Sequence, residues 1–280
     1  MTQQVESNKQ RAPNGTMSPR RSSSSGLSVS ESLSSVELAV TEAVRAYRTA
    51  SIDEATRMAP LWALLNSVRA PGALHPICVA LSQTRPFLDY AYIHNNGFFV
   101  LYVADPDLGL QVRLHVWVPD RPPHHEQPHR HRMGFVSHVI AGTLRSTVYE
   151  RAATDDESAE LFEELGVSGP AHSDFANNCS GLEVGSLVGL RPVGSKTHHA
   201  GETYQFPAAG IHRVDTPQGF TSPVITLTVW EPAFQPSLAY EPVATKTHAR
   251  PMAVQRLTPD EYDDIIGLVL AATSEGAHSD

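Results

Sequence analysis

Three histidines constrain the fold of this 280-residue chain more than any other feature of its sequence. His129 and His131 are two residues apart, and side chains two apart on a β-strand point to the same face. His212 follows far downstream, so a strand from a distant part of the chain would bring the third imidazole. Three protein ligands with open positions are typical of a catalytic metal site, because a structural site tends to be closed. The sequence therefore predicts distant strands that converge on one metal ion.

The residues that follow the histidine pair predict a β-hairpin. Phe135–Ile140 is a largely apolar run that ends in the turn residues Ala141–Thr143. Leu144–Tyr149 then has the composition of the returning strand. The histidine pair thus lies directly before a predicted β-hairpin.

Each candidate ligand has an alternative interpretation, since the chain contains 14 histidines and an HxH pair also arises by chance. His129 and His131 could be surface residues of a proline-rich loop, and His212 could be an ordinary turn histidine. His124 and His125 could support the site, replace a ligand, or be solvated loop residues.

The two stretches resemble the two signature motifs of the cupin superfamily. One motif places an HxH pair and a glutamate before a glycine; the other places a glycine, a proline and a histidine in that order. The resemblance covers roughly residues 95–235. It implies an all-β fold, a cupin double-stranded β-helix (jelly-roll) barrel with flanking N- and C-terminal α-helices. It also implies that the three histidines hold a metal. The matching residues are His129, His131 and Gly142 in the first motif and Gly201, Pro207 and His212 in the second.

The chain departs from the cupin pattern at four positions. Pro123 replaces the first glycine, Gly210 is displaced by one position, and Thr216 replaces an asparagine. Phe135 occupies the place of the metal-binding glutamate. Three neutral imidazoles leave a divalent ion with its full charge, and opposite unit charges 4 Å apart attract by about 4 kcal/mol at an effective dielectric constant of 20. Such a site is expected to favour a thiolate, enolate or carboxylate on the metal.

Loss of the glutamate is similar to the three-histidine thiol dioxygenases, of which cysteine dioxygenase is the familiar member. That resemblance implies Fe(II), O2 and a small anionic substrate such as a thiol. The match to cysteine dioxygenase itself is poor. Phe135 and Val136 stand where that family has a cysteine, and its substrate-binding arginine has no counterpart within Phe98–Tyr102. Two alternatives stay open: a non-redox isomerase or lyase on Zn, Mn, Ni or Cu, and a ligand-binding cupin without chemistry.

The segment before the histidine pair supplies candidate catalytic residues. Gln111–Val118 alternates, so Arg113 and His115 share one face and valines and a leucine share the other. If the polar face looks into the barrel, Arg113 is expected to hold an anionic group and His115 to relay protons. The alternative is that this face is the wetter side of a sheet. Tyr204 and Ser137 are weaker candidates for the pocket.

Composition divides the chain into four parts. Residues 1–33 are serine-rich and low in large apolar side chains, which predicts a disordered tail. Residues 34–75 form an N-terminal helical segment, and residues 76–240 form the barrel, with an insertion at about 152–182 that opens with an acidic helical stretch. Residues 241–280 form a C-terminal extension with a helix at 258–273, capped by Thr258. The insertion could be a lid, an oligomer contact or a solvated excursion.

Charge and cysteine content exclude some classes of partner. A net charge of −9 disfavours a nucleic-acid partner, and the absence of a run of 18 apolar residues predicts no membrane span. Two cysteines, Cys78 and Cys179, make no disulfide framework, so we expect a reduced, cytoplasmic protein. The expected partners are a small-molecule substrate and O2. The cupin resemblance also implies a homodimer, since cupins are often dimers.

Overall fold

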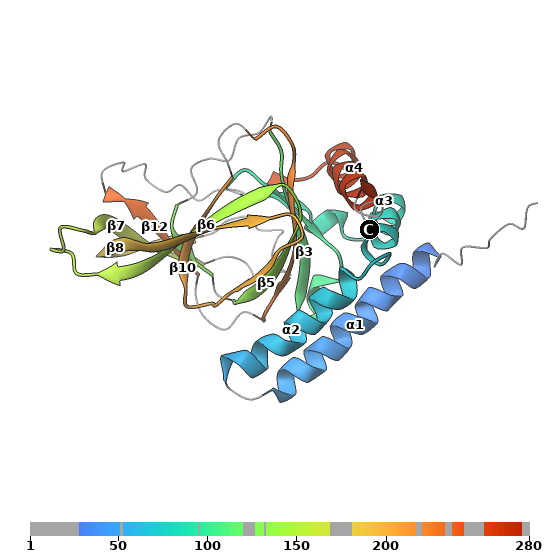
Figure 1. Ribbon diagram of the computed structural model, residues 1–280, viewed down its shortest axis with the longest axis horizontal. Coiled ribbons are helices and arrows are strands. Elements are labelled where there is room, and N and C mark those ends of the chain that lie inside the picture. Colours follow the sequence, from blue (N-terminus) through green and yellow to red (C-terminus); the bar gives the residue numbers. More distant parts are fainter. Residues whose placement is uncertain are drawn as a thin grey trace, which may run out of the picture.

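The structure is a computed structural model that describes residues 28–50, 53–94, 96–119, 127–131, 133–168, 181–216, 220–232, 237–243 and 255–275. These residues are mostly β-sheet, in two antiparallel sets of strands with α-helices against one of them (Figure 1). No helix within these ranges is long and apolar enough to cross a membrane. The stretches 1–27, 120–126 and 169–180, with Pro123, His124, His125 and Cys179, lie outside the described residues.

The N-terminal helices begin earlier than the sequence predicted. Helix α1 spans Val29–Thr49 and α2 spans Glu54–Val68. The predicted disordered tail to residue 33 is therefore wrong over its last residues, because a capping box starts α1. Ser28 accepts a hydrogen bond from the backbone of Glu31, and Glu31 accepts one from the backbone of Ser28.

Helix α3, Leu74–Thr84, falls inside the range that we had assigned to the barrel, and that boundary is also wrong. Its buried residues recur at helical spacing, and Pro76 is tolerated because it lies in the first turn. α3 packs against α4, Pro259–Glu275, where the Arg85 guanidinium pairs with Asp263. Thr258 caps α4 through a reciprocal pair of hydrogen bonds with Glu261.

The strands form a seven-stranded sheet, here called sheet A, and a closed ring of six strands, here called ring B. In spatial order, sheet A is β13 (Gln255–Arg256), β1 (Tyr92–Ile93), β2 (Phe99–Tyr102), β3 (Gln111–Trp117), β11 (Val224–Trp230), β5 (Phe135–Ala141) and β9 (Thr203–Phe206). Of two short 3-10 helices, Leu88–Tyr90 lies between α3 and β1, and Pro106–Leu108 lies between β2 and β3. Ring B is β10 (Ile211–Asp215), β4 (His129–Arg130), β12 (Ser237–Pro242), β7 (Glu160–Ser168), β8 (Gly181–His199) and β6 (Thr143–Ala152).

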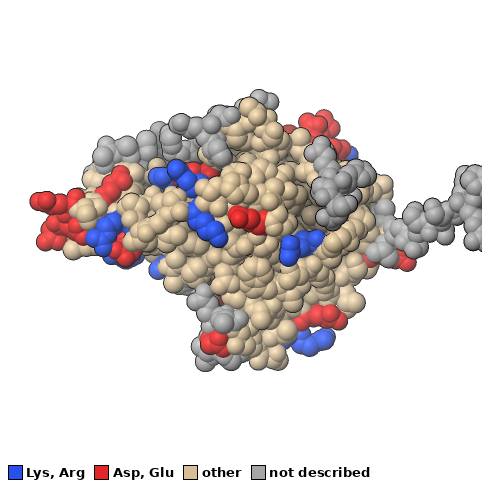
Figure 2. Space-filling model, in the orientation of Figure 1, with Lys and Arg blue, Asp and Glu red and all other residues tan. Residues whose placement is uncertain are grey.

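Within the insertion, Glu160–Ser168 forms strand β7 rather than part of the predicted acidic helix. β7 pairs with both β8 and β12, so its backbone is committed to a sheet. A bulge between Glu163 and Leu165 lets Phe162 and Leu165 both face inward, a spacing that resembles helical periodicity in the sequence. Leu161 stays 39% exposed. Figure 2 shows acidic side chains at the left end of the molecule, the end at which Figure 1 labels β7 and β8. The turn between β6 and β7 contains Asp155.

The central strands of sheet A, β2, β3 and β11, are buried on both faces. Val112 and Leu114 belong to the main hydrophobic core together with Val40 of α1 and Leu61 of α2, and α2 lies against β5 and β11 (Figure 1). The opposite face of β3, which carries Arg113, is equally buried. The side chains of β3 alternate as predicted. Its polar face points into the barrel, because the helices cover its apolar face.

The chain bends at Gly142, where a turn was predicted, but β5 and β6 do not form the predicted hairpin. Within the described ranges, β5 pairs with β9 and β11, whereas β6 pairs with β8 and β10.

The backbone at Gly142 leads to a stability prediction. Gly142 has a φ of 77°, and an added Cβ would lie 2.9 Å from Val224. Gly201 has a φ of 89°, but a Cβ there meets nothing within 4 Å. Gly201→Ala is expected to cost about 1–2 kcal/mol from backbone strain alone, and Gly142→Ala more. Urea unfolding of both variants measures the difference; equal losses would contradict the role of the Val224 contact.

Candidate metal centre

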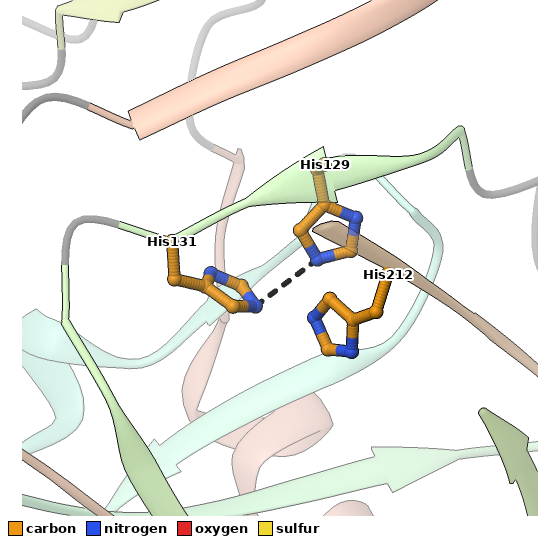
Figure 3. Close-up of side chains that lie close together, drawn as sticks. All are labelled: His129, His131 and His212. Atoms are coloured by element: carbon orange, nitrogen blue, oxygen red, sulfur yellow. Dashed lines mark hydrogen bonds between the residues drawn. The ribbon is translucent and has the colours of Figure 1, made fainter. Parts of the chain in front are cut away.

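The three predicted ligands come together where ring B faces sheet A. β4 carries His129, His131 follows directly after it, and β10 carries His212 (Figure 3). β10 pairs with β4 so that His212 lies directly opposite His129. Because residues two apart share a face, His131 points to the same side, as the HxH pattern predicted.

The nitrogens of these rings are close enough to share one ion. The Nε2 atoms of His129 and His131 are 3.0 Å apart, and one ligand atom from each of the three residues lies within 4.8 Å of the others. The Nδ1–H of His129 donates to the carbonyl of Gln127 at 3.0 Å, which leaves its Nε2 lone pair directed at the other rings. Both ring nitrogens of His212 are buried without a hydrogen-bond partner in the described chain. Such orphaned nitrogens fit a metal ligand.

Burial keeps these imidazoles neutral, which is the form that binds a metal. Removal from water lowers the pKa of His129, and it lowers the pKa of His131 and His212 well below the usual value. The neighbouring imidazoles lower the pKa of His131 further, since two adjacent rings cannot both be charged at low cost. Little proton competition is therefore expected at neutral pH.

Aromatic rings form the wall of the site on the side of sheet A. Phe135, which stands in the place of the cupin glutamate, has its ring 5.7 Å from His131 and 6.0 Å from His212. Trp230 lies 4.7 Å from His131, and Phe206 is stacked on His212 at 4.0 Å. Among the described residues, no carboxylate belongs to the ligand group. The donor set is three imidazoles, as the sequence predicted.

Arg113 lies inside the barrel and is only 8% exposed. Its guanidinium donates to the side-chain oxygen of Gln111 and lies over the rings of Tyr102 and Trp230, at 5.1 and 5.3 Å. Its Nε has no hydrogen-bond partner, and within the described ranges no carboxylate lies within 4 Å of it. A buried charge without a counter-charge is costly, so an anion that entered this interior would be stabilised by Arg113.

His115 faces the same interior, two residues along β3 from Arg113. Its ring lies 6.1 Å from Trp230 and 5.2 Å from Phe98. Burial, with Arg113 adding to it, lowers the pKa of His115 well below the usual value. His115 is therefore a neutral proton donor and acceptor close to a fixed positive charge.

Sequence reasoning missed His94, which follows β1 and stacks on Phe98 at 4.3 Å. Burial lowers the pKa of His94 to about 3, with smaller contributions from His129 and Arg113. The Nδ1 of His94 accepts from the backbone of Asn96 at 3.2 Å, so its proton is on Nε2. The signal was a histidine just before a glycine turn between two strands, a position that gives no indication of which way the ring points.

The weaker candidates lie further from the ligands. Tyr204 is on β9, 6.1 Å from Phe135, and stacks on His198 at 4.0 Å. Phe135 thus stands between Tyr204 and the ligand His131. Ser137 is buried and shares a hydrogen bond of 2.9 Å with Thr228, so its hydroxyl is already satisfied.

No family model and no curated protein matches this chain. Among solved structures, an oxalate oxidase is similar at 17% identity and a TM-score of 0.30, over 66% of this chain and 75% of that one. The Mn(II)-containing oxalate decarboxylase of Bacillus subtilis is similar at 14% identity and a TM-score of 0.30, over 55% of this chain and 30% of that one. A cupin-2 domain protein from Shewanella frigidimarina is similar at 16% identity and a TM-score of 0.24, over 48% of this chain and 78% of that one. These neighbours are cupin proteins, but TM-scores this low carry no argument, so the functional argument rests on the site.

The lowered pKa values predict that the metal-free protein loses stability in acid. A histidine whose folded pKa lies below its usual value near 6.5 binds more protons when unfolded, so its contribution is complete above pH 6.5 and declines below it. His94, with a pKa of about 3, alone accounts for a loss of roughly 2 kcal/mol between pH 8 and pH 5. Urea unfolding at these pH values measures the loss, and His94→Gln should reduce it. A flat profile from pH 8 to 5 would contradict the neutral imidazoles.

Proposed function

We propose that this chain is a cupin-type metalloenzyme, a mononuclear Fe(II)-dependent dioxygenase that oxidises a small anionic substrate, such as a thiol, with O2. One observation carries the proposal: three neutral imidazoles converge, in an interior that also holds a guanidinium, and no carboxylate of the described residues joins the imidazoles or pairs with the guanidinium. The motif resemblance supports the cupin barrel, and the two antiparallel strand systems are compatible with it.

His129, His131 and His212 would hold the ion through neutral nitrogens. Iron bound there would supply the redox chemistry that joins O2 to the substrate. For a thiolate, both oxygen atoms end on sulfur: RS⁻ and O2 give the sulfinate RSO2⁻, so the electrons balance without a separate reductant. Because the three ligands are neutral, they would not offset the positive charge of the metal ion. That charge would then attract the substrate anion.

Arg113 would bind a second anionic group of the substrate, such as a carboxylate. Gln111 already accepts one of its hydrogens, and two aromatic rings restrict the plane of the guanidinium, so its remaining hydrogens have a defined direction. An arginine fork held in this way suits a planar carboxylate. The substrate would then lie between the ligand histidines and β3.

His115 would handle protons beside the bound substrate. Its ring is neutral because of burial and Arg113, so it can take up a proton from a thiol only while a compensating negative charge is present. Tyr204 would act as part of the wall beside Phe135. The aromatic wall would exclude water from the site.

A non-redox isomerase or lyase is the second candidate, because three imidazoles suit Zn, Mn, Ni and Cu as well as Fe. The donor set is common to both candidates, and oxygen consumption separates them. We further propose a cytoplasmic protein, since Cys78 is a buried free thiol, and a homodimer by analogy with other cupins.

The first test is metal content after anaerobic purification, followed by oxygen uptake of the Fe(II)-loaded protein with a panel of small thiols. We expect one iron per chain and thiol-dependent uptake. His131→Ala should abolish uptake with the fold intact, whereas His199→Ala, an exposed histidine on β8, should leave it unchanged. Uptake that survives in His131→Ala would remove the metal-site proposal, and tight binding of another metal without uptake would favour the isomerase or lyase.

The role of Arg113 predicts opposite effects on binding and on stability. Arg113→Met should raise KM for an anionic substrate about 10- to 100-fold, because a hydrogen bond to a charged group contributes about 1.5–3 kcal/mol. The ligand-free variant should be at least as stable as the wild type, since the buried charge has no counter-charge in the described part of the chain. Arg191→Met, on the exposed side of β8, is the control. A clear loss of stability with an unchanged KM would assign Arg113 a structural role instead.

A further inference from the structure

Glu231 is a buried carboxylate close to the metal centre that sequence reasoning did not identify. It directly follows Trp230 at the end of β11, and only 1% of its surface is exposed. A carboxylate buried to this degree has to be surrounded by hydrogen-bond donors. Its donors come from three separate parts of the chain: helix α1, helix α2 and the loop before β5.

The two helices hold one oxygen of this carboxylate. The Tyr47 hydroxyl of α1 and the Arg57 Nε of α2 both donate to Oε1, each at 3.1 Å. Burial and the charge of Glu231 raise the pKa of Tyr47 to about 12, so its hydroxyl remains a donor at physiological pH. The α1–α2 pair thus determines where the carboxylate lies.

The other oxygen holds the backbone of Gly134. The Gly134 N–H donates to Oε2 at 2.8 Å, and the Gly134 carbonyl accepts from the backbone N–H of Glu231 at 2.9 Å. Both backbone groups of Gly134 are therefore bound to one residue. A Cβ at Gly134 would lie 2.5 Å from Oε2, so the approach requires glycine.

Gly134 lies where the chain passes from the ligand His131 into β5. It follows His131 by three residues, and the next residue, Phe135, packs against the His131 ring. Fixing Gly134 therefore fixes both the end of the loop that carries His131 and the ring against which His131 rests. A ligand held in place before binding costs less entropy to order when the metal arrives.

We infer that Glu231 is a positioning residue for the metal centre, which ties the His131 loop to helices α1 and α2. The inference rests on the metal site proposed above. Glu231→Gln is nearly isosteric, but its one amide oxygen cannot accept from Gly134 and from the two helices together, so an amide N–H must face a donor. The hydrogen bonds on one side of the Glu231 side chain are then lost, and the position of His131 is less well fixed.

The test uses Co(II) as a spectroscopic probe of the metal-free full chain. We expect Glu231→Gln to weaken Co(II) binding about tenfold, the low end of the range for residues that orient metal ligands, and to alter the visible Co(II) bands. Titrations are made well below the unfolding temperature, so that a loss of stability alone does not change them. Tyr47→Phe removes one donor and leaves the charge, so a smaller loss in the same direction is expected.

The matched control is Asp263→Asn, which breaks the exposed pair between Asp263 and Arg85 of α3 by the same carboxylate-to-amide change. It should leave the Co(II) affinity and spectrum as in the wild type. If Glu231→Gln does not fold, Tyr47→Phe decides, and an unchanged affinity in that variant overturns the inference. Failure of the wild type to bind Co(II) would instead overturn the proposed metal site, so the two failures are distinguishable.

Discussion

The metal centre depends on the pairing of β10 with β4, which sets His212 opposite His129. Side chains alternate along a strand, so a slip of one residue in this pairing would turn the His212 imidazole to the outside. The longer pairing of β10 with β6, from Ile211 opposite Tyr149 to Asp215 opposite Arg145, fixes the register. β6 in turn begins directly after Gly142, where the chain passes from β5 of sheet A into ring B. A glycine turn far from the metal therefore contributes to placing the third ligand.

Desolvation then determines the chemistry of the interior. It drives the buried imidazoles to their neutral form, which makes them ligands, whereas the Arg113 guanidinium keeps its charge because arginine is not deprotonated in proteins. No described carboxylate offsets that charge within salt-bridge distance. An interior arranged in this way is less stable than an apolar one would be and binds anions better. Such a loss of stability at one place is typical of a functional site.

The sequence predicted those parts of the site that follow from strand periodicity. The two-residue spacing of His129 and His131 and the alternation around Arg113 each imply a face, and the structure has these faces. Periodicity gave a wrong prediction in β7, where a bulge precedes Leu165. The bulge gives the apolar residues of this strand a spacing that resembles that of a helix. It was silent on His94, because a residue at the end of a two-residue strand is oriented by tertiary packing. Long-range contacts of this kind leave no local pattern.

The buried carboxylate links the outer helices to the loop that carries one of the three ligands. Phe135 stands where the cupin pattern has a glutamate, yet the end of β11 carries Glu231 within reach of the same loop. Arg57 neutralises its charge, and Tyr47 and Gly134 occupy its oxygens, so it does not belong to the ligand group. The helices outside sheet A thus have two effects on the site. They cover the apolar face that the sheet would otherwise expose, and they hold the carboxylate that binds the backbone of Gly134 after the ligand His131.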